Sequence, residues 1–163
     1  RQNQHGRLVS GLLRVSPLAL TGVSRGDALV AVMGEAPPGV CRLTLAQRAR
    51  MVPTLGSLGP TATARVLRWA SDWSRHDLDA AHVHLGPVAV DAHLQGQGLG
   101  SLLLLDHCRR LDEGHLVGYL ETDKPANVTF YRRFGYRVVR QGRTLGVPTW
   151  FMRRDPTPDM ADL

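Results

Sequence analysis

The stretch VAVDAHLQGQGLGSLLL, residues 88–104, decides the fold that we expect for this chain. Its beginning predicts the end of a strand, its middle a turn with glycines at positions 96, 98 and 100, and its end a buried helix. Glycines let the backbone approach a ligand closely, and free N–H groups at a helix start attract phosphate. The stretch therefore indicates a cradle for a diphosphate.

Two common phosphate-binding motifs are disfavoured here. No Gly-Lys-Ser/Thr follows the turn, as a P-loop requires, and position 101 is serine where the dinucleotide pattern GxGxxG has its last glycine. A glycine-rich turn alone is weak support for function, because strand-to-helix junctions also use glycine for structural reasons.

Outward from this turn, the chain alternates between strand-like and helix-like segments. Apolar periodicity and turn residues predict strands over 18–23, 28–33, 82–90, 115–122, 136–139 and 149–153. They predict helices over 7–15, 44–55, 61–76, 99–111 and 125–134, with Pro17 ending the first and Gly135 the last. This order predicts an α/β (α+β) mixed sheet with helices on its faces.

Two burial expectations accompany these elements. Trp69 and Trp73 recur at helical spacing and are expected in the core, since such an aromatic pair usually packs inward. The run from Leu102 to Leu105 predicts heavy burial of the helix that follows the glycine turn.

Length and composition fit one globular domain over residues 1–163, with a frayed tail at 155–163. Of the 163 residues, 43% are apolar and 21% charged, which is ordinary for soluble proteins. No apolar run approaches the roughly 20 residues that span a bilayer. Cys41 and Cys108 lack CxxC spacing and are expected to be ordinary thiols of a reducing compartment. We expect a cytoplasmic protein with no membrane partner.

The net charge of +6 raises the question of whether this protein binds nucleic acid. The basic residues are nineteen arginines and one lysine spread along the chain, and only 6% of residues are aromatic. A nucleic-acid surface would instead predict a continuous basic face with interleaved aromatics. Nucleic acid is therefore not an expected partner, although a basic surface suits a ligand with several phosphates.

The pattern Gln95-x-x-Gly98-x-Gly100 after a strand resembles the acyl-CoA-binding signature of the GNAT acetyltransferase superfamily, Q/R-x-x-G-x-G/A. The resemblance continues through residues 119–139, YLETDKPANVTFYRRFGYRVV. Residues 85–154 look similar to the bacterial branch that includes puromycin N-acetyltransferase, which shares QGxGLGS, YLET, N-x-x-FY-x-R-x-G and TWxM. The resemblance implies the GNAT fold: a mostly antiparallel central sheet with a splayed parallel strand pair and helices on both faces.

The resemblance also implies acetyl-CoA as cofactor. Its arm would lie between the strands that end at Val90 and Thr122, and its diphosphate would lie on the turn. The residues implied in cofactor binding are Val88, Ala89, Val90, Gln95, Gly96, Gln97, Gly98, Leu99, Gly100, Ser101, Asn127 and Tyr131. Lys124 departs from the Asn or Ser that many relatives carry there, so no role is expected for it.

The resemblance implies Tyr131 as the general acid, because a phenol with a pKa near 10 stays protonated at neutral pH and can protonate the departing thiolate. The attacking amine must lose a proton, and His84 and Glu121 are the two candidate bases, with Glu121 slightly ahead. No Cys-His or Ser-His-Asp order favours an acyl-enzyme, so direct transfer is expected. His93, His107 and His115 lack ligand spacing, and we expect no metal.

The acceptor is expected to be the primary amine of a small molecule, with a protein N-terminus or lysine as the alternative. Relatives usually have a strand and two helices before the region 18–33, so the N-terminal part is expected to be incomplete. A non-catalytic acyl-CoA-binding or regulatory module is the other class of function left open. We expect a monomer or a homodimer.

Overall fold

The computed structural model describes residues 2–16, 18–40 and 43–157, except for the side chains of residues 2, 3 and 5. Pro17, which was expected to end the first helix, lies outside the described residues. So do Cys41 and the tail residues 158–163.

A six-stranded mixed sheet lies at the centre of the fold, with strand order β1-β2-β3-β4-β6-β5. The strands are β1 (Ala19–Arg25), β2 (Ala28–Ala36), β3 (His82–Val90), β4 (Val117–Thr122), β5 (Arg137–Thr144) and β6 (Val147–Arg154). All neighbouring pairs are antiparallel except β3 and β4, which are parallel. The predicted mostly antiparallel sheet with one parallel pair is confirmed.

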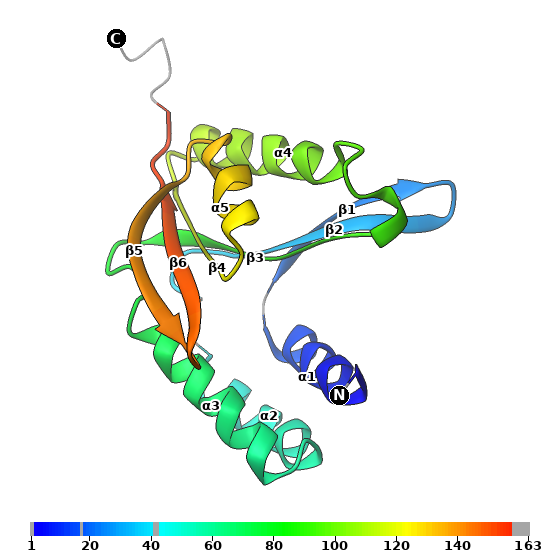
Figure 1. The fold of residues 1–163 in the computed structure, drawn as a ribbon, viewed down its shortest axis with the longest axis vertical. Coiled ribbons are helices and arrows are strands. Elements are labelled where there is room, and N and C mark those ends of the chain that lie inside the picture. Colours follow the sequence, from blue (N-terminus) through cyan, green and yellow to red (C-terminus); the bar gives the residue numbers. More distant parts are fainter. Residues whose placement is uncertain (1, 17, 41–42, 158–163) are drawn as a thin grey trace.

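Helices flank this sheet on both sides, as predicted. They are α1 (Gln2–Val15), α2 (Leu45–Ser57), α3 (Pro60–Ser74), the short 3-10 helix η1 (Ala92–Leu94), α4 (Leu99–Glu113) and α5 (Pro125–Arg132). Helix α4 packs across β1 to β4, and α5 contacts β4 and β5. Figure 1 shows α4 and α5 on one side of the sheet and α1, α2 and α3 on the other.

Helix α4 is amphipathic, so the leucine run is buried only in part. Leu103 and Leu104 are fully buried against the sheet, whereas Leu102 and Leu105 are 56% and 59% exposed. At 3.6 residues per turn, four consecutive residues reach around the whole helix, so they cannot all face one sheet. The expected heavy burial of the run is wrong for these two residues.

Trp69 and Trp73 are half-buried, and the prediction that they lie in the core is wrong. Their rings pack on each other, with centroids 4.3 Å apart, and α3 has no fully buried residue. The helix contacts α2 and the edge strand β5. An edge offers less apolar surface than a sheet face, so the pair is covered on one side only.

A chain of polar groups is buried between α4 and the sheet. The fully buried ring of His107 donates from Nδ1 to the Glu35 carboxylate, and its Nε2 lies 2.6 Å from the Tyr136 hydroxyl. Arg110 donates to the other oxygen of Glu35 at 2.5 Å. Burial would raise the pKa of Glu35, but hydrogen bonds and charges from His107 and Arg110 hold that pKa below its usual range. Burial also raises the pKa of Tyr136 far above its ordinary value.

The described part of the tail is held to the domain. Arg154 makes two hydrogen bonds of 2.8 Å to the Asp112 carboxylate and one of 2.9 Å to the Phe134 carbonyl. The backbone N–H of Thr157 donates to the same Asp112 at 2.7 Å. Over residues 155–157, the expected fraying is therefore wrong.

Candidate active site

The parallel strands β3 and β4 part in the middle of the sheet. Their pairing runs from His82 with Val117 to His84 with Tyr119, although β3 continues to Val90 and β4 to Thr122. Strand β2 remains paired with β3 as far as Val90. The backbone of β3 beyond His84 therefore has a partner strand on one edge only, as the predicted splay requires.

The glycine turn between β3 and α4 is open. Residues 95–98 are exposed. Gly96 and Gly98 have φ of 78° and 85°, and a Cβ added at either glycine would meet no atom within 4 Å beyond the adjacent residues. Within the described residues, no backbone N–H from residue 96 to residue 101 donates a hydrogen bond. The first N–H beyond them that does so is that of Leu102, which donates to the Gly98 carbonyl at 3.0 Å. These amides are available to an anion, and the positive end of the α4 dipole lies among them.

Side chains around the turn fix its shape. Asp91 accepts a hydrogen bond from the His93 N–H at 2.9 Å, and the Gln95 side chain donates to the Val90 carbonyl at 3.3 Å. Arg25, at the end of β1, donates to the Gln97 side chain at 3.3 Å. Of the two glutamines predicted at the site, Gln95 thus contacts the end of β3, and Gln97 contacts the end of β1.

The turn, the end of β3 and helix α5 meet at Gly100. A Cβ at this position would lie 3.6 Å from the Phe130 ring and 3.8 Å from the Val90 side chain. Leu99 is buried and Ser101 is half-buried at the start of α4. The three segments predicted to form the site therefore converge at one end of the splayed pair.

Tyr131 and Asn127 lie on α5 beside this junction. Tyr131 packs, partly buried, against the same core cluster as Val88 and Val90, while Ala89 is exposed. Its hydroxyl makes no hydrogen bond within the described residues. Burial raises the pKa of Tyr131 above its ordinary value, so the phenol stays protonated at neutral pH.

Asn127 donates from Nδ2 to the buried Thr122 hydroxyl at 3.1 Å. This bond fixes the side chain of Asn127 over the end of β4. Thr122 was not predicted as a site residue; its place directly after Glu121, at the end of a predicted strand, was the one signal available.

His84 and Glu121, predicted as alternative bases, form a pair. His84 Nε2 lies 2.7 Å from Glu121 Oε2, where the last paired residues of β3 and β4 meet. The Glu121 side chain is 3% exposed and that of His84 is 22% exposed. The histidine is thus the more accessible member of the pair.

The other histidines considered from sequence lie elsewhere. His93 and His115 are exposed, and His107 belongs to the buried polar chain. The prediction that they are structural or solvated agrees with these positions.

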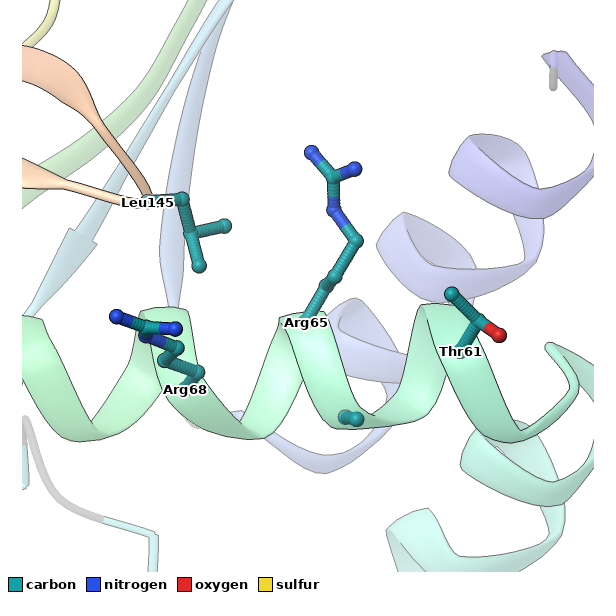
Figure 2. A pocket seen from close by; sticks show the side chains of 5 residues that line it. Thr61, Arg65, Arg68 and Leu145 are labelled. Carbon is teal, nitrogen blue, oxygen red and sulfur yellow. The ribbon is translucent and has the colours of Figure 1, made fainter.

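A separate hollow lies between α3 and the turn that joins β5 to β6. It is lined by Thr61, Ala64, Arg65, Arg68 and Leu145. Figure 2 shows the Arg65 and Arg68 side chains projecting from α3 on the side that faces Leu145. None of the predicted site residues lines this hollow.

Comparison with known proteins gives a consistent result. Residues 62–138 match the family model described as an acetyltransferase (GNAT) domain. A structure from Corynebacterium glutamicum, titled histone acetyltransferase HPA2 and related acetyltransferase, matches with a TM-score of 0.70 and 18% identity, over 98% of this chain and 77% of that one. The ribosomal-protein-S18-alanine N-acetyltransferase of Escherichia coli matches with a TM-score of 0.54 and 15% identity, over 90% and 74%. The NatB acetyltransferase complex bound to CoA and MES matches with a TM-score of 0.52 and 13% identity, over 96% and 83%.

The chain has the mixed α/β fold of GNAT proteins, including the parallel strand pair. The match of residues 62–138, somewhat less than half of the chain, to the acetyltransferase (GNAT) model supports an acyltransferase, and the solved structures, at 13–18% identity, show the fold. GNAT acetyltransferases use acetyl-CoA and act on amine acceptors. Among the described residues, no helix has the length and apolar character needed to cross a membrane.

Proposed function

We propose that this protein is an acetyl-CoA-dependent N-acetyltransferase that moves an acetyl group directly to a primary amine of a small molecule. One observation carries the proposal. The N–H groups of residues 96–101 have no acceptor in the described protein, and they lie where two parallel strands part.

The turn and the open strand edge suit the two ends of the cofactor. The amides from Gly96 to Ser101 would bind the diphosphate at the start of α4, where the helix dipole favours negative charge. The backbone from Val88 to Val90 would hydrogen-bond the pantetheine arm as a neighbouring strand would. Asn127, whose side chain donates to Thr122 at 3.1 Å, would contact the same arm. The net charge of +6 also favours a ligand with several phosphates.

Bound acetyl-CoA supplies the acetyl group as a thioester. Tyr131 would hold a proton at its hydroxyl oxygen for the departing sulfur. Its raised pKa keeps that proton in place at neutral pH, and its hydroxyl makes no competing hydrogen bond within the described residues. Backbone N–H groups of β3 aimed at the acetyl oxygen would stabilise the negative charge that develops there.

The His84–Glu121 pair would take the proton from the attacking amine. His84 is the more exposed of the two and would receive the proton, directly or through water, while Glu121 would orient the ring. This proposal joins the two alternatives offered by the sequence, because the side chains are 2.7 Å apart.

A small-molecule amine follows the resemblance to the bacterial branch that includes puromycin N-acetyltransferase. The solved structures with this fold include an enzyme named for acetylating a ribosomal protein, so a protein amine is the alternative acceptor. We propose one domain over residues 1–163.

Thermal unfolding tests the cofactor site. Acetyl-CoA at millimolar concentration should raise the melting temperature of the wild-type protein. Gly98→Ala should reduce that increase, because it adds a Cβ to the open turn at a φ of 85°. Gly146→Ala is the matched control, since Gly146 has the same φ of 85° and equally open surroundings but lies in the β5–β6 turn. No increase in the wild type would refute the cofactor assignment.

A panel of amines assayed for release of free thiol tests the reaction itself. Turnover with a small-molecule amine supports the proposal. Turnover only with peptide amines would redirect it to a protein acceptor, and cofactor binding without turnover on any amine would favour a non-catalytic acyl-CoA-binding module.

A further inference from the structure

We propose that Asp77, His82 and His84 form a binding site for a divalent cation of the zinc type. Each of the three side chains offers a ligand atom within 4.8 Å of the other two. Asp77 lies in the loop that joins α3 to β3, and the two histidines alternate along β3, so they lie on one face of the strand. Two imidazoles and one carboxylate are a ligand set that zinc accepts, with a fourth position left for water.

The orientation of His82 suits a metal ligand. Its Nδ1 lies 2.8 Å from the Ala80 carbonyl oxygen, which can only accept, so Nδ1 carries the hydrogen. Nε2 lies 3.0 Å from the Asp77 carboxylate, and a cation bound by both atoms would displace the proton that a histidine–carboxylate pair shares without metal.

His84 and His82 each make the hydrogen bond that is common in metal-binding histidines. Such a ring usually donates its other N–H to a carboxylate or a backbone carbonyl, which fixes its orientation and raises its basicity. Glu121 supplies the carboxylate for His84, at 2.7 Å, and Ala80 supplies the carbonyl for His82. Both rings are therefore held by the groups that orient ligands in metal sites. Because Glu121 holds Nε2 of His84, a cation would bind the Nδ1 that takes the amine proton in the proposed acetyl transfer, so a bound cation would block that role of His84.

The surroundings keep the three side chains in place. The Tyr119 ring packs edge-on against both imidazoles, with centroid distances of 5.1 and 5.4 Å, and its hydroxyl donates to the His76 carbonyl at 2.8 Å. The side chains of His82, Asp77 and His84 are 5%, 13% and 22% exposed. The cluster is thus enclosed but reachable from solvent.

From the sequence alone we expect no metal in this chain. That expectation rests on His93, His107 and His115, which lack ligand spacing and lie in separate parts of the structure. Asp77 and the pair His82 and His84 are brought together by the turn that precedes β3.

Cobalt titration tests the site, because Co²⁺ replaces zinc and reports its coordination through visible absorption. The full chain, untagged and stripped with a chelator, should bind one Co²⁺ with the intense visible bands of four-coordinate cobalt. One equivalent of Zn²⁺ should abolish these bands. The readout needs neither acetyl-CoA nor an amine, so its failure is distinct from a failure of the proposed acetyl transfer.

Variants decide which side chains bind. Asp77→Asn and His82→Ala should each weaken cobalt binding about tenfold or more, while His115→Asn, which changes an exposed histidine, should bind as the wild type does. Melting curves in chelator show whether each variant is folded, and Asp77→Asn is the variant that keeps the size of the side chain. No visible bands in the wild type, or equal binding by folded Asp77→Asn, would overturn the proposal in favour of a histidinium–carboxylate pair.

Discussion

Replacing Tyr131 with phenylalanine separates catalysis from folding. The hydroxyl of Tyr131 makes no hydrogen bond within the described residues, so its removal leaves no buried partner unsatisfied. The free energy of unfolding should change by less than about 0.5 kcal/mol, as for substitutions without such contacts. Loss of a general acid should lower kcat about 10²- to 10⁴-fold, which corresponds to about 3 to 5 kcal/mol of activation free energy.

Tyr136 provides the matched control, because its ring lies 6.0 Å from that of Tyr131. Its hydroxyl is buried against His107 Nε2 at 2.6 Å. Tyr136→Phe leaves that nitrogen without its partner, at a cost of about 1 to 3 kcal/mol. At about 2 to 4 °C per kcal/mol for a chain of this size, the melting temperature should fall by several degrees.

The assay combines thiol release, acetyl-CoA affinity and melting curves for both variants. Tyr131→Phe should lose turnover and keep both cofactor affinity and melting temperature, whereas Tyr136→Phe should show a lower melting temperature with turnover retained in the folded protein. Wild-type turnover in Tyr131→Phe would refute the general-acid role while leaving the fold intact.

Two other predictions concern carboxylates. Glu121→Gln should lower kcat about 10²-fold with little change in the KM for acetyl-CoA, because glutamine keeps the size of the side chain next to His84 but cannot stabilise a protonated ring; equal loss of cofactor affinity would instead indicate a structural role. Asp112 has its pKa lowered chiefly by its hydrogen bonds from Arg154, against the effect of burial. A lowered folded-state pKa stabilises the protein above the unfolded value, near 3.9, and this contribution is lost as pH falls through the folded value. Asp112→Asn should therefore melt lower than wild type at pH 7, and the difference should disappear in acid; a constant difference across pH would contradict the ion pair.

The sequence predicts most elements of this fold because apolar periodicity and turn residues are local signals. The turn at 95–101 is an example: its glycines predict the positive φ of Gly96 and Gly98 and the start of α4 at Leu99. Periodicity says less about which face is covered. The Trp69 and Trp73 spacing is the same whether α3 packs on a sheet face or on the edge strand β5.

Contacts between distant residues could not be predicted by the same means. His84 and Glu121 are 37 residues apart, and only the parallel register of β3 and β4 joins them. His107 gives no sequence signal either, because its partners Glu35 and Tyr136 come from two other segments. Spacing along the sequence relates residues within one helix or strand, whereas these hydrogen-bond partners come from several elements.

The buried chain through His107 has a consequence for the diphosphate turn. Helix α4 begins at that turn, and a shift of one residue along the helix would rotate His107 by about 100°. Arg110 would turn with it, so the Glu35 carboxylate would lose both of its partners, and a carboxylate left unpaired in the interior is costly. The buried hydrogen bonds thus fix the rotation of α4 about its axis. They also fix the direction in which the backbone amides at the start of the helix point. In related proteins that keep the function, we expect Glu35, His107 and Tyr136 to be conserved together or substituted together.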